Sequence, residues 1–419
     1  MDIMKVAVAE INPTANVSRK DLTPEDPEYQ QIEASIDGFG LVEPLVWNKR
    51  TKNLVGGHQR FKILVQKGYK EIEVSVVDLD LQQEKALNLA LNKVQGLWEK
   101  KNLAVLVDEL IKIPDFNIQS IGFDEKEVSQ LFDRYLDITS EDDFDFEKEA
   151  EGIVTPVTQK GDLIVLGNHR LLCSDSSDSN SMVLLMDGSV ANMLLTDPVY
   201  CIDYINTVRP KACRKWEKLY KDDLSQPEYE KWLRQILTII EPHLLPGAPF
   251  YIFNGFRQFP QMITTLEGLN FQISCVITWV KETFTMSFGD YHQGCEFALY
   301  GWKRAKQGGH PWYGGADQST VWSIARGATS KYEHPTQKPI ELFARAIRNS
   351  SKRSDIIVDP FAGSGTAILA SESLDRRCFS IEIEPKYCDV IVRRYIAYKG
   401  INNVSEELRK KYFPEVANG

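Results

Sequence analysis

The chain has 419 residues, of which 43% are hydrophobic and 26% are charged, and this is typical of a soluble globular protein with two or three domains. Its net charge of −10 argues against uniform coating of nucleic acid but leaves room for local basic patches. No apolar run reaches the roughly 20 residues of a membrane span, and the first residues lack a signal-peptide core. Seven cysteines without a Cys-x-x-Cys pair indicate neither a disulfide framework nor a zinc site, so we expect a cytoplasmic protein without membrane contact or bound metal.

Residues 1–98 mix short β-like runs with helical periodicity. Apolar runs at 43–47 and 73–77 indicate strands, and we expect a small α/β domain here. Residues 99–152 are expected to form a helical and acidic linker. Acidic side chains far outnumber basic ones from 137 to 151, and such a run is usually solvated.

Residues 153–415 alternate apolar runs with helical segments. This pattern predicts an α/β fold with a doubly wound, mainly parallel sheet that is covered on both faces. In such sheets, ligands bind beyond the carboxyl ends of the strands. We therefore expect the chemistry in the loops that follow the apolar runs. These runs lie at 191–195, 249–253, 271–279, 355–358 and 379–381.

One such loop is rich in glycine, has the sequence Asp359-Pro-Phe-Ala-Gly-Ser-Gly-Thr366, and opens a helical segment. Gly363 and Gly365 allow a sharp turn and a close approach of a ligand to the backbone, because neither carries a Cβ. The next apolar run ends in Glu382. A carboxylate at this position could accept hydrogen bonds from both ribose hydroxyls of an adenosine.

Several interpretations of this loop compete. A dinucleotide fold normally has a third glycine three residues after the second, where this chain has Ile368. A P-loop needs a lysine and a hydroxyl after its last glycine, and Ala367 and Ile368 supply neither. The loop could also be a plain turn of an α/β sheet. A cofactor with an adenosine but no pyrophosphate fits best, and S-adenosylmethionine is such a cofactor.

Three motifs together resemble those of the amino-group DNA methyltransferases, in the order found in the β class. They are Thr196-Asp-Pro-Val-Tyr200, His334-Pro-Thr-Gln-Lys-Pro339 and the glycine-rich loop at 359–366. The resemblance implies the S-adenosylmethionine-dependent methyltransferase fold, with Asp197, Pro198 and Tyr200 as catalytic residues. It also implies that the cofactor is bound by Asp175, Thr336, Gln337, Lys338, Asp359, Phe361, Gly363, Gly365 and Glu382.

The chemistry of such a reaction gives each catalytic residue a role. The exocyclic amine of a base is a poor nucleophile because its lone pair is delocalised into the ring. Asp197 and the carbonyl of Pro198 could accept its two hydrogens and free the lone pair for in-line attack on the sulfonium methyl. Since the amine is out of reach inside a duplex, the base must flip out, and Tyr200 offers a ring on which it can stack.

The first motif departs from the family pattern Asp-Pro-Pro-Tyr at one position, because Val199 replaces the second proline. The valine frees the backbone at 199 and restores an N–H group there. The loop could be less rigid, but the groups at 197, 198 and 200 remain. Cys201 invites comparison with cytosine ring-carbon methyltransferases, but an amine needs no covalent activation, and we assign this cysteine to packing.

The target base is expected to be adenine, methylated at N6, because an aspartate at position 197 resembles the adenine enzymes more than the cytosine-N4 enzymes. Cytosine N4 remains the alternative. The substrate is expected to be double-stranded DNA, with a companion restriction nuclease and a homodimer left open. A catalytically silent DNA-binding or partitioning module and a small-molecule or RNA methyltransferase are the rival functions.

Sequence recognition is expected in an insertion at about 282–332, which is rich in glycine and aromatic residues. Its aromatic side chains, among them Trp312 and Trp322, suit base contacts, and ordinary packing is the alternative. A basic stretch at 209–221 is the candidate for phosphate contacts, with a solvated helical face as the alternative. The expected DNA-binding residues are Arg209, Lys211, Arg214, Lys215, Tyr291 and His292.

Residues 29–69 resemble the N-terminal domain of ParB proteins, a ParB/sulfiredoxin-like α/β domain whose relatives bind nucleotides or cleave DNA. The family's Gly-His-x-Arg is present with Gly57, His58 and Arg60, but the alanine usual three residues later is Ile63. A helix N-terminus with glycines and an arginine suits a nucleotide or phosphate. No clear metal-binding acid cluster supports nuclease action, and a pure docking role is the alternative.

Overall fold

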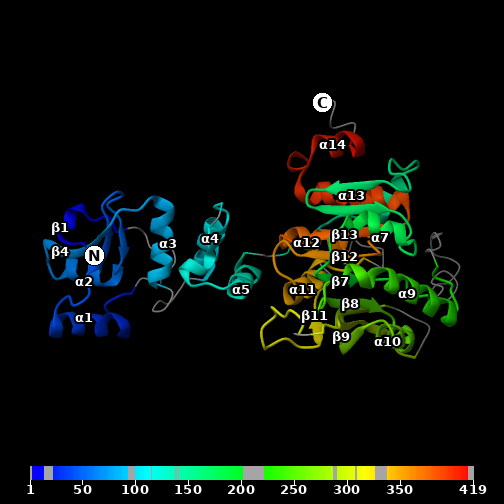
Figure 1. Cartoon of the computed structure of the whole chain (residues 1–419), viewed down its shortest axis with the longest axis horizontal. Helices are drawn as coiled ribbons and strands as arrows, with labels where there is room; N and C mark the ends of the chain where they lie inside the picture. The colour runs from blue at the N-terminus through cyan, green and yellow to red at the C-terminus, as the bar shows by residue number, and fades with distance from the viewer. Residues whose placement is uncertain are drawn as a thin grey trace. The chain divides into compact units, whose positions relative to one another are not determined.

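A computed structural model gives the structure of the chain (Figure 1). It divides into two compact units, residues 1–137 and 138–419, which are described separately. No helix in the described parts is both long enough and apolar enough to cross a bilayer. The structure describes residues 2–13, 22–92, 100–114, 116–136, 139, 141–201, 221–285, 290–306, 309–325 and 337–413.

The first unit contains a four-stranded sheet in the order β1-β4-β2-β3, in which β2 and β4 run parallel and the other pairs antiparallel. Its core includes Leu45, Trp47, Ile63 and Val74, all of which are buried. A second cluster joins the helices that follow the sheet. The elements are β1 (Asp2–Ala7), η1 (Val8–Glu10), α1 (Pro27–Phe39), β2 (Leu45–Asn48), β3 (Leu54–Gly56), α2 (His58–Gln66), β4 (Glu71–Val77), α3 (Leu81–Asn92), α4 (Lys100–Ile111), η2 (Ile118–Ile121) and α5 (Glu125–Tyr135).

The second unit is built on a sheet of nine described strands in the order β11-β9-β10-β8-β7-β12-β13-β6-β5. The strands from β8 to β6 in this order run parallel, and so do β11 and β9, whereas β10 pairs antiparallel with β8 and β9, and β5 pairs antiparallel with β6. This confirms the expected mainly parallel sheet. The strands are β5 (Leu163–Leu166), β6 (His169–Cys173), β7 (Met193–Thr196), β8 (Pro249–Asn254), β9 (Phe271–Thr285), β10 (Gln293–Lys303), β11 (Val321–Ser323), β12 (Ile356–Asp359) and β13 (Arg377–Glu382).

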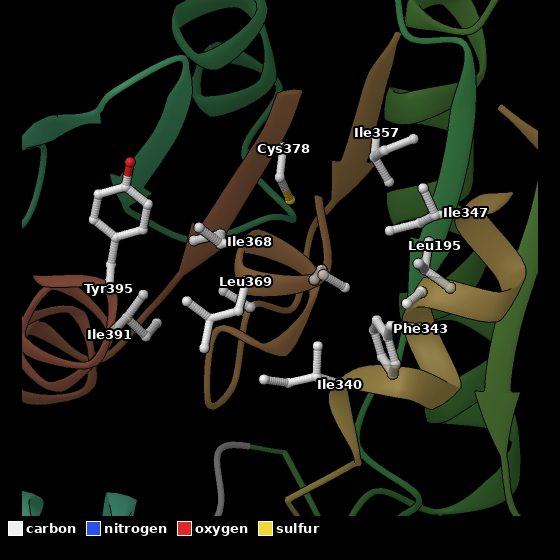
Figure 2. Packing of buried hydrophobic residues seen from close by; sticks show 14 of the residues in the cluster. Leu195, Ile340, Phe343, Ile347, Ile357, Ile368, Leu369, Cys378, Ile391 and Tyr395 are labelled. Carbon is white, nitrogen blue, oxygen red and sulfur yellow. The ribbon is translucent and has the colours of Figure 1, made fainter. Parts of the chain in front are cut away.

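Helices cover both faces of this sheet, with α11 and α12 on one side of the strands and α7 and α9 on the other (Figure 1). Because side chains alternate along a strand, Leu194 joins one core and Leu195 the other. Figure 2 shows Leu195 with Phe343 and Ile347 of α11. The helices are α6 (Phe146–Gly152), α7 (Ser179–Met186), α9 (Gln226–Ile240), η3 (Glu241–His243), η4 (Phe256–Gln258), α10 (Phe259–Glu267), α11 (Ile340–Ser350), α12 (Thr366–Ser373), α13 (Pro385–Lys399), η6 (Ile401–Asn403) and α14 (Glu406–Tyr412).

The expected recognition insertion contributes to this core as well as to the surface. Trp322 of β11 is 1% exposed, and its ring centroid lies 6.1 Å from that of Tyr251 in β8. Trp312 packs against the same core. Tyr291, at the turn between β9 and β10, is 91% exposed. Ordinary packing therefore accounts for Trp312 and Trp322, while Tyr291 stays available at the surface.

Candidate active site

The first motif, the glycine-rich loop and Glu382 lie at the carboxyl ends of three neighbouring strands of the sheet. β12 runs parallel to both β7 and β13, so that the carboxyl ends of all three strands lie together. Asp197 directly follows β7, and Asp359 and Glu382 are the last residues of β12 and β13. The Thr196 hydroxyl donates a 2.6 Å hydrogen bond to Asp359 Oδ1, which joins the first motif to the glycine-rich loop.

A buried cluster of charges surrounds the first motif. Lys338 Nζ lies 2.5 Å from Asp197 Oδ2 and 3.1 Å from Glu296 Oε2. The Tyr200 hydroxyl donates to Glu296 Oε2 over 3.2 Å, and Lys281 pairs with the other oxygen of Glu296. The side chain of Lys338 is 7% exposed and that of Glu296 is 13% exposed. The fold thus brings Asp197, Tyr200 and Lys338 together.

Sequence reasoning missed Glu296 and Lys281. Both lie on the β9–β10 hairpin, roughly a hundred residues from the first motif, and belong to no recognised pattern. A signal did exist: Glu296 interrupts a strand that continues as Phe-Ala-Leu-Tyr, and an acid in a buried strand needs a cationic partner.

The charges in this cluster shift one another's pKa values. Burial raises the pKa of Asp197, with the charge of Lys338 opposing the rise and that of Glu296 adding to it. Burial would also raise the pKa of Glu296, but Lys338 and Lys281 outweigh it and lower this pKa to about 2. Burial would lower the pKa of Lys338, yet the two carboxylates raise it. Lys338 therefore stays a cation that holds negative charge at Asp197.

One oxygen of Asp197 is left for a ligand. Lys338 takes Oδ2, whereas Oδ1 is buried and accepts no hydrogen bond from the parts of the chain that the structure describes. A buried acceptor without a donor is costly. Pro198 beside it is buried, and Gln258 Nε2 donates to the carbonyl of Tyr200 over 2.8 Å. The arrangement presents a fixed acceptor to an N–H donor.

Cys201 has the properties of a packing residue. Its thiol donates to the carbonyl of Lys221 over 3.1 Å, and its side chain packs into the core that contains α9. Burial raises the pKa of this thiol to about 12, so that it is not a thiolate at neutral pH. These contacts support the assignment of Cys201 to packing.

The glycine-rich loop leaves its backbone open on one side. Gly363 and Gly365 have φ values of +53° and +78°, a region that favours glycine. A Cβ at Gly365 would lie 2.8 Å from the side chain of Ile391, which fixes the close packing of α12 on α13. A Cβ at Gly363 would meet only the carbonyl oxygen of Phe361, at 3.8 Å. Among the described residues, space is therefore left for a ligand at the backbone of Gly363.

Glu382 closes this loop. Its carboxylate accepts 3.0 Å hydrogen bonds from the backbone N–H groups of Gly363 and Glu384. Burial raises its pKa to about 7, although these N–H groups oppose the rise. Burial likewise raises the pKa of Asp359 to about 7, opposed by the hydrogen bonds from Thr196 and from the backbone of Phe361. Both carboxyl groups retain lone pairs for a ligand.

Three further expected cofactor residues, Asp175, Phe361 and Gln337, are described by the structure. Asp175 Oδ1 accepts hydrogen bonds from the N–H and the hydroxyl of Ser177, at 2.8 and 2.7 Å, and so stabilises its own turn. That turn is tied to β13, because the N–H of Ser174 donates to the carbonyl of Glu382 over 2.9 Å. The ring of Phe361 lies 5.3 Å from that of Trp232. Gln337 is half-buried beside Lys338.

Several expected residues fall outside the site as described. Thr336, Arg209, Lys211, Arg214 and Lys215 lie outside the described residues. Tyr291 and His292 are at the turn of the β9–β10 hairpin, whose strands carry Lys281 and Glu296.

In the first unit, the Gly-His-x-Arg motif lies at the start of α2. Gly57 has a φ of +89°, and a Cβ there would come within 2.4 Å of Leu45 Cδ2, so this position is confined to glycine. His58 is the first residue of the helix. Arg60 Nη1 donates to the carbonyl of Glu43 and pairs with its carboxylate, both at 2.8 Å. A phosphate at Arg60 would have to share it with Glu43.

Two family models match the sequence. Residues 191–393 match the N6_N4_Mtase model, described as DNA methylase. Residues 101–160 match the model described as ParB-methyltransferase HTH domain. The second match covers most of the stretch that was expected to be a linker.

Curated relatives are type II methyltransferases. M2.MboI of Moraxella bovis is 33% identical over 251 residues, which are 54% of this chain and 88% of that protein. M.HpaI of Haemophilus parainfluenzae is 26% identical over 272 residues, which are 58% of this chain and 79% of that protein.

Solved structures of methyltransferases also resemble the chain. The M1.HpyAVI-SAM complex is 23% identical with a TM-score of 0.40, covering 54% of this chain and 98% of that one. The cytosine-N4-specific PvuII DNA methyltransferase is 19% identical with a TM-score of 0.43, and the match covers 63% of this chain and 95% of that one. The family assignment rests on the sequence matches: the chain belongs to the N6/N4 DNA methylase family and is a DNA methyltransferase with S-adenosylmethionine as its cofactor.

Proposed function

We propose that this protein transfers the methyl group of S-adenosylmethionine to the N6 amine of an adenine flipped out of double-stranded DNA. The observation that carries the proposal is Oδ1 of Asp197, a buried acceptor to which no described residue donates, at the same sheet edge as the glycine-rich loop. The choice of adenine rests on the aspartate at position 197, since the family covers both amines.

S-Adenosylmethionine supplies an electrophilic methyl group on a sulfonium. Asp197 Oδ1 and the carbonyl of Pro198 accept the two hydrogens of the amine, so that its lone pair turns away from the ring. Burial in a site of low dielectric strengthens both hydrogen bonds. The methyl group would leave the sulfonium sulfur, which becomes a neutral thioether, for the amine nitrogen. Asp197 Oδ1 would then take the surplus proton from that nitrogen, because its raised pKa makes it a better acceptor than an exposed aspartate.

Lys338 and Glu296 prepare Asp197 for this role. The ammonium group fixes Oδ2, which aims Oδ1 in one direction. Lys338 Nζ also lies 5.3 Å from the centroid of the Tyr200 ring, and the Tyr200 hydroxyl is anchored on Glu296. The tyrosine is therefore held at both its ring and its hydroxyl, and a flipped base would stack on a preorganised surface.

The cofactor is proposed to lie along the glycine-rich loop. Its ribose hydroxyls would donate to Glu382, and the open side of Gly363 would accept its adenosine. Gln337, Asp175, Asp359 and Phe361 are proposed to contribute further contacts to the cofactor. The β9–β10 turn with Tyr291 and His292 is proposed to contact DNA, because the strands below it reach the charged cluster.

The proposal is tested with duplex DNA and methyl-labelled S-adenosylmethionine. The digested product is separated into nucleosides by mass spectrometry, which distinguishes N6-methyladenine from N4-methylcytosine. Asp197→Asn keeps the shape of the side chain but removes its charge, and we expect the rate of transfer to fall at least about a hundredfold. Label on cytosine would overturn the choice of base. Equal rates for the Asp197→Asn variant and the unmodified protein would overturn the proposed role of Asp197.

A further inference from the structure

The acidic stretch before β5 is attached to the methyltransferase unit, contrary to the expectation of a solvated linker. Glu141 Oε2 accepts a hydrogen bond from the N–H of Ile340, and Glu141 Oε1 accepts one from the N–H of Glu341, both at 2.9 Å. These N–H groups are the first of α11 and have no partner inside the helix. A carboxylate at this end also interacts favourably with the helix dipole. Glu141 thus fixes the helix start two residues after Lys338.

Asp142 makes a second attachment, to Arg394 of α13. The two carboxylate oxygens accept hydrogen bonds from Nε and Nη2 of the guanidinium at 2.6 and 2.9 Å, so that the two side chains form a bidentate pair. The side chain of Arg394 is 1% exposed and that of Asp142 is 12% exposed. Such a buried cation requires its carboxylate partner.

The remaining nitrogen of Arg394 reaches the glycine-rich loop from behind. Nη1 donates to the carbonyl of Ser364 over 2.8 Å and lies 3.3 Å from the hydroxyls of Ser364 and Thr366. The Thr366 hydroxyl in turn donates to the carbonyl of Lys338 over 3.3 Å. One set of contacts therefore joins the acidic stretch, the glycine-rich loop and the turn that carries Lys338.

We propose that Glu141 and Asp142 are positioning residues for the methyltransferase site, which hold the glycine-rich loop and the Lys338 turn in the arrangement that binds S-adenosylmethionine. They touch neither the cofactor nor the substrate, and act through Arg394 and through the start of α11. The inference rests on the proposed location of the cofactor at this loop. It gives the acidic stretch at the start of the second unit a role in the affinity for the cofactor.

The loop is held at Gly363 and Ala362 by hydrogen bonds to Glu382 and Ile381, and Arg394 adds the contacts at Ser364 and Thr366. Between Gly363 and Gly365 the backbone has positive φ at both glycines, and glycine is the residue that gains most from unfolding. In the Asp142→Asn variant, Arg394 would lose its charged partner. Its Nη1 contact with Ser364 would then no longer be held in place. We expect the loop to sample other conformations, which lowers the population competent to bind the cofactor.

The test uses this chain with Asp142→Asn and Glu141→Gln, and Asp143→Asn as the matched control, since Asp143 is an exposed acid directly after Asp142. Binding of S-adenosylmethionine is titrated calorimetrically without DNA. We expect Asp142→Asn to weaken binding about tenfold, Glu141→Gln to weaken it by a smaller factor, and Asp143→Asn to change it less than about twofold. Hydrogen exchange of the backbone N–H groups at residues 363–366 should accelerate in Asp142→Asn but not in Asp143→Asn.

A purely structural role would lower the melting temperature of Asp142→Asn and leave the dissociation constant of the folded protein unchanged, which would overturn the proposal. If Asp142→Asn does not fold, Glu141→Gln decides in its place, and unchanged affinity there refutes the inference. In methylation assays the KM for the cofactor should rise, with kcat at saturating cofactor nearly unchanged. Because the titration needs no DNA, it remains readable even if no methyl group reaches adenine, and Glu382→Gln separately tests the location of the cofactor.

Discussion

The affinity for S-adenosylmethionine should rise with pH between about 6 and 8 through the ionisation of Glu382. Burial raises the pKa of this carboxyl group to about 7 in the free protein, although the N–H groups of Glu384 and Gly363 oppose the rise. The carboxylate is the better acceptor for two ribose hydroxyls, so binding favours the ionised form. A protonated Glu382 must therefore lose its proton as the cofactor binds.

The size of the effect follows from the pKa. With a pKa of about 7, Glu382 is ~90% protonated at pH 6 and ~10% protonated at pH 8. If only the ionised form binds, the dissociation constant falls about tenfold across these two pH units, a change of ~1.4 kcal/mol. At pH 7, about half a proton should be released for each cofactor bound.

Calorimetric titrations at pH 6, 7 and 8, in buffers with different ionisation enthalpies, measure both the affinity and the proton release. The Glu382→Gln variant cannot ionise at this position, and its affinity should lose most of the pH dependence. Asp359 also has a pKa of about 7, so Asp359→Asn is the matched control. The reasoning is refuted if Glu382→Gln keeps the full tenfold change while Asp359→Asn abolishes it.

Three other substitutions test separate parts of the site. Lys338→Met removes the cation between two buried carboxylates and should lower the free energy of unfolding by ~3 kcal/mol, measured by urea denaturation; an unchanged midpoint would show that the pair is not formed. Gly365→Ala combines a φ of +78° with a contact of 2.8 Å to Ile391 and should cost ~1–3 kcal/mol in the same assay. Val199→Pro should change the single-turnover methylation rate by less than about threefold, and a large gain in rate would mark the valine as a defect.

The apolar runs of the sequence predicted five of the nine described strands, β7, β8, β9, β12 and β13, while β5, β6, β10 and β11 were not predicted. The runs at 191–195 and 355–358 became β7 and β12, because segments of this length between helices must pair side by side to satisfy their backbone groups. Parallel pairing then brings the loops after them to one edge. The proximity of Asp197, Asp359 and Glu382 thus followed from the order of the strands.

The charged cluster could not be predicted in the same way. Glu296 reaches Lys338, and Lys281 reaches Glu296, only because β9 and β10 pair in one register next to β8, and a register is set by packing across the whole sheet. The acidic composition led to the expectation that Glu141 and Asp142 are solvated, whereas both make contacts inside the second unit. A run of acids is solvated unless cationic or N–H partners face it, and the partners here, Arg394 and the start of α11, lie about two hundred residues further along.

The same contacts explain why a valine at position 199 is compatible with an active site. In the family pattern a second proline restricts the backbone there. In this chain the neighbouring groups are held by side chains from other elements: Lys338 fixes Asp197, while Tyr200 is anchored on Glu296 and its carbonyl accepts from Gln258. Because three separate elements hold this loop, its rigidity does not depend on the ring of a second proline. Val199 is therefore weak support for a catalytically silent protein.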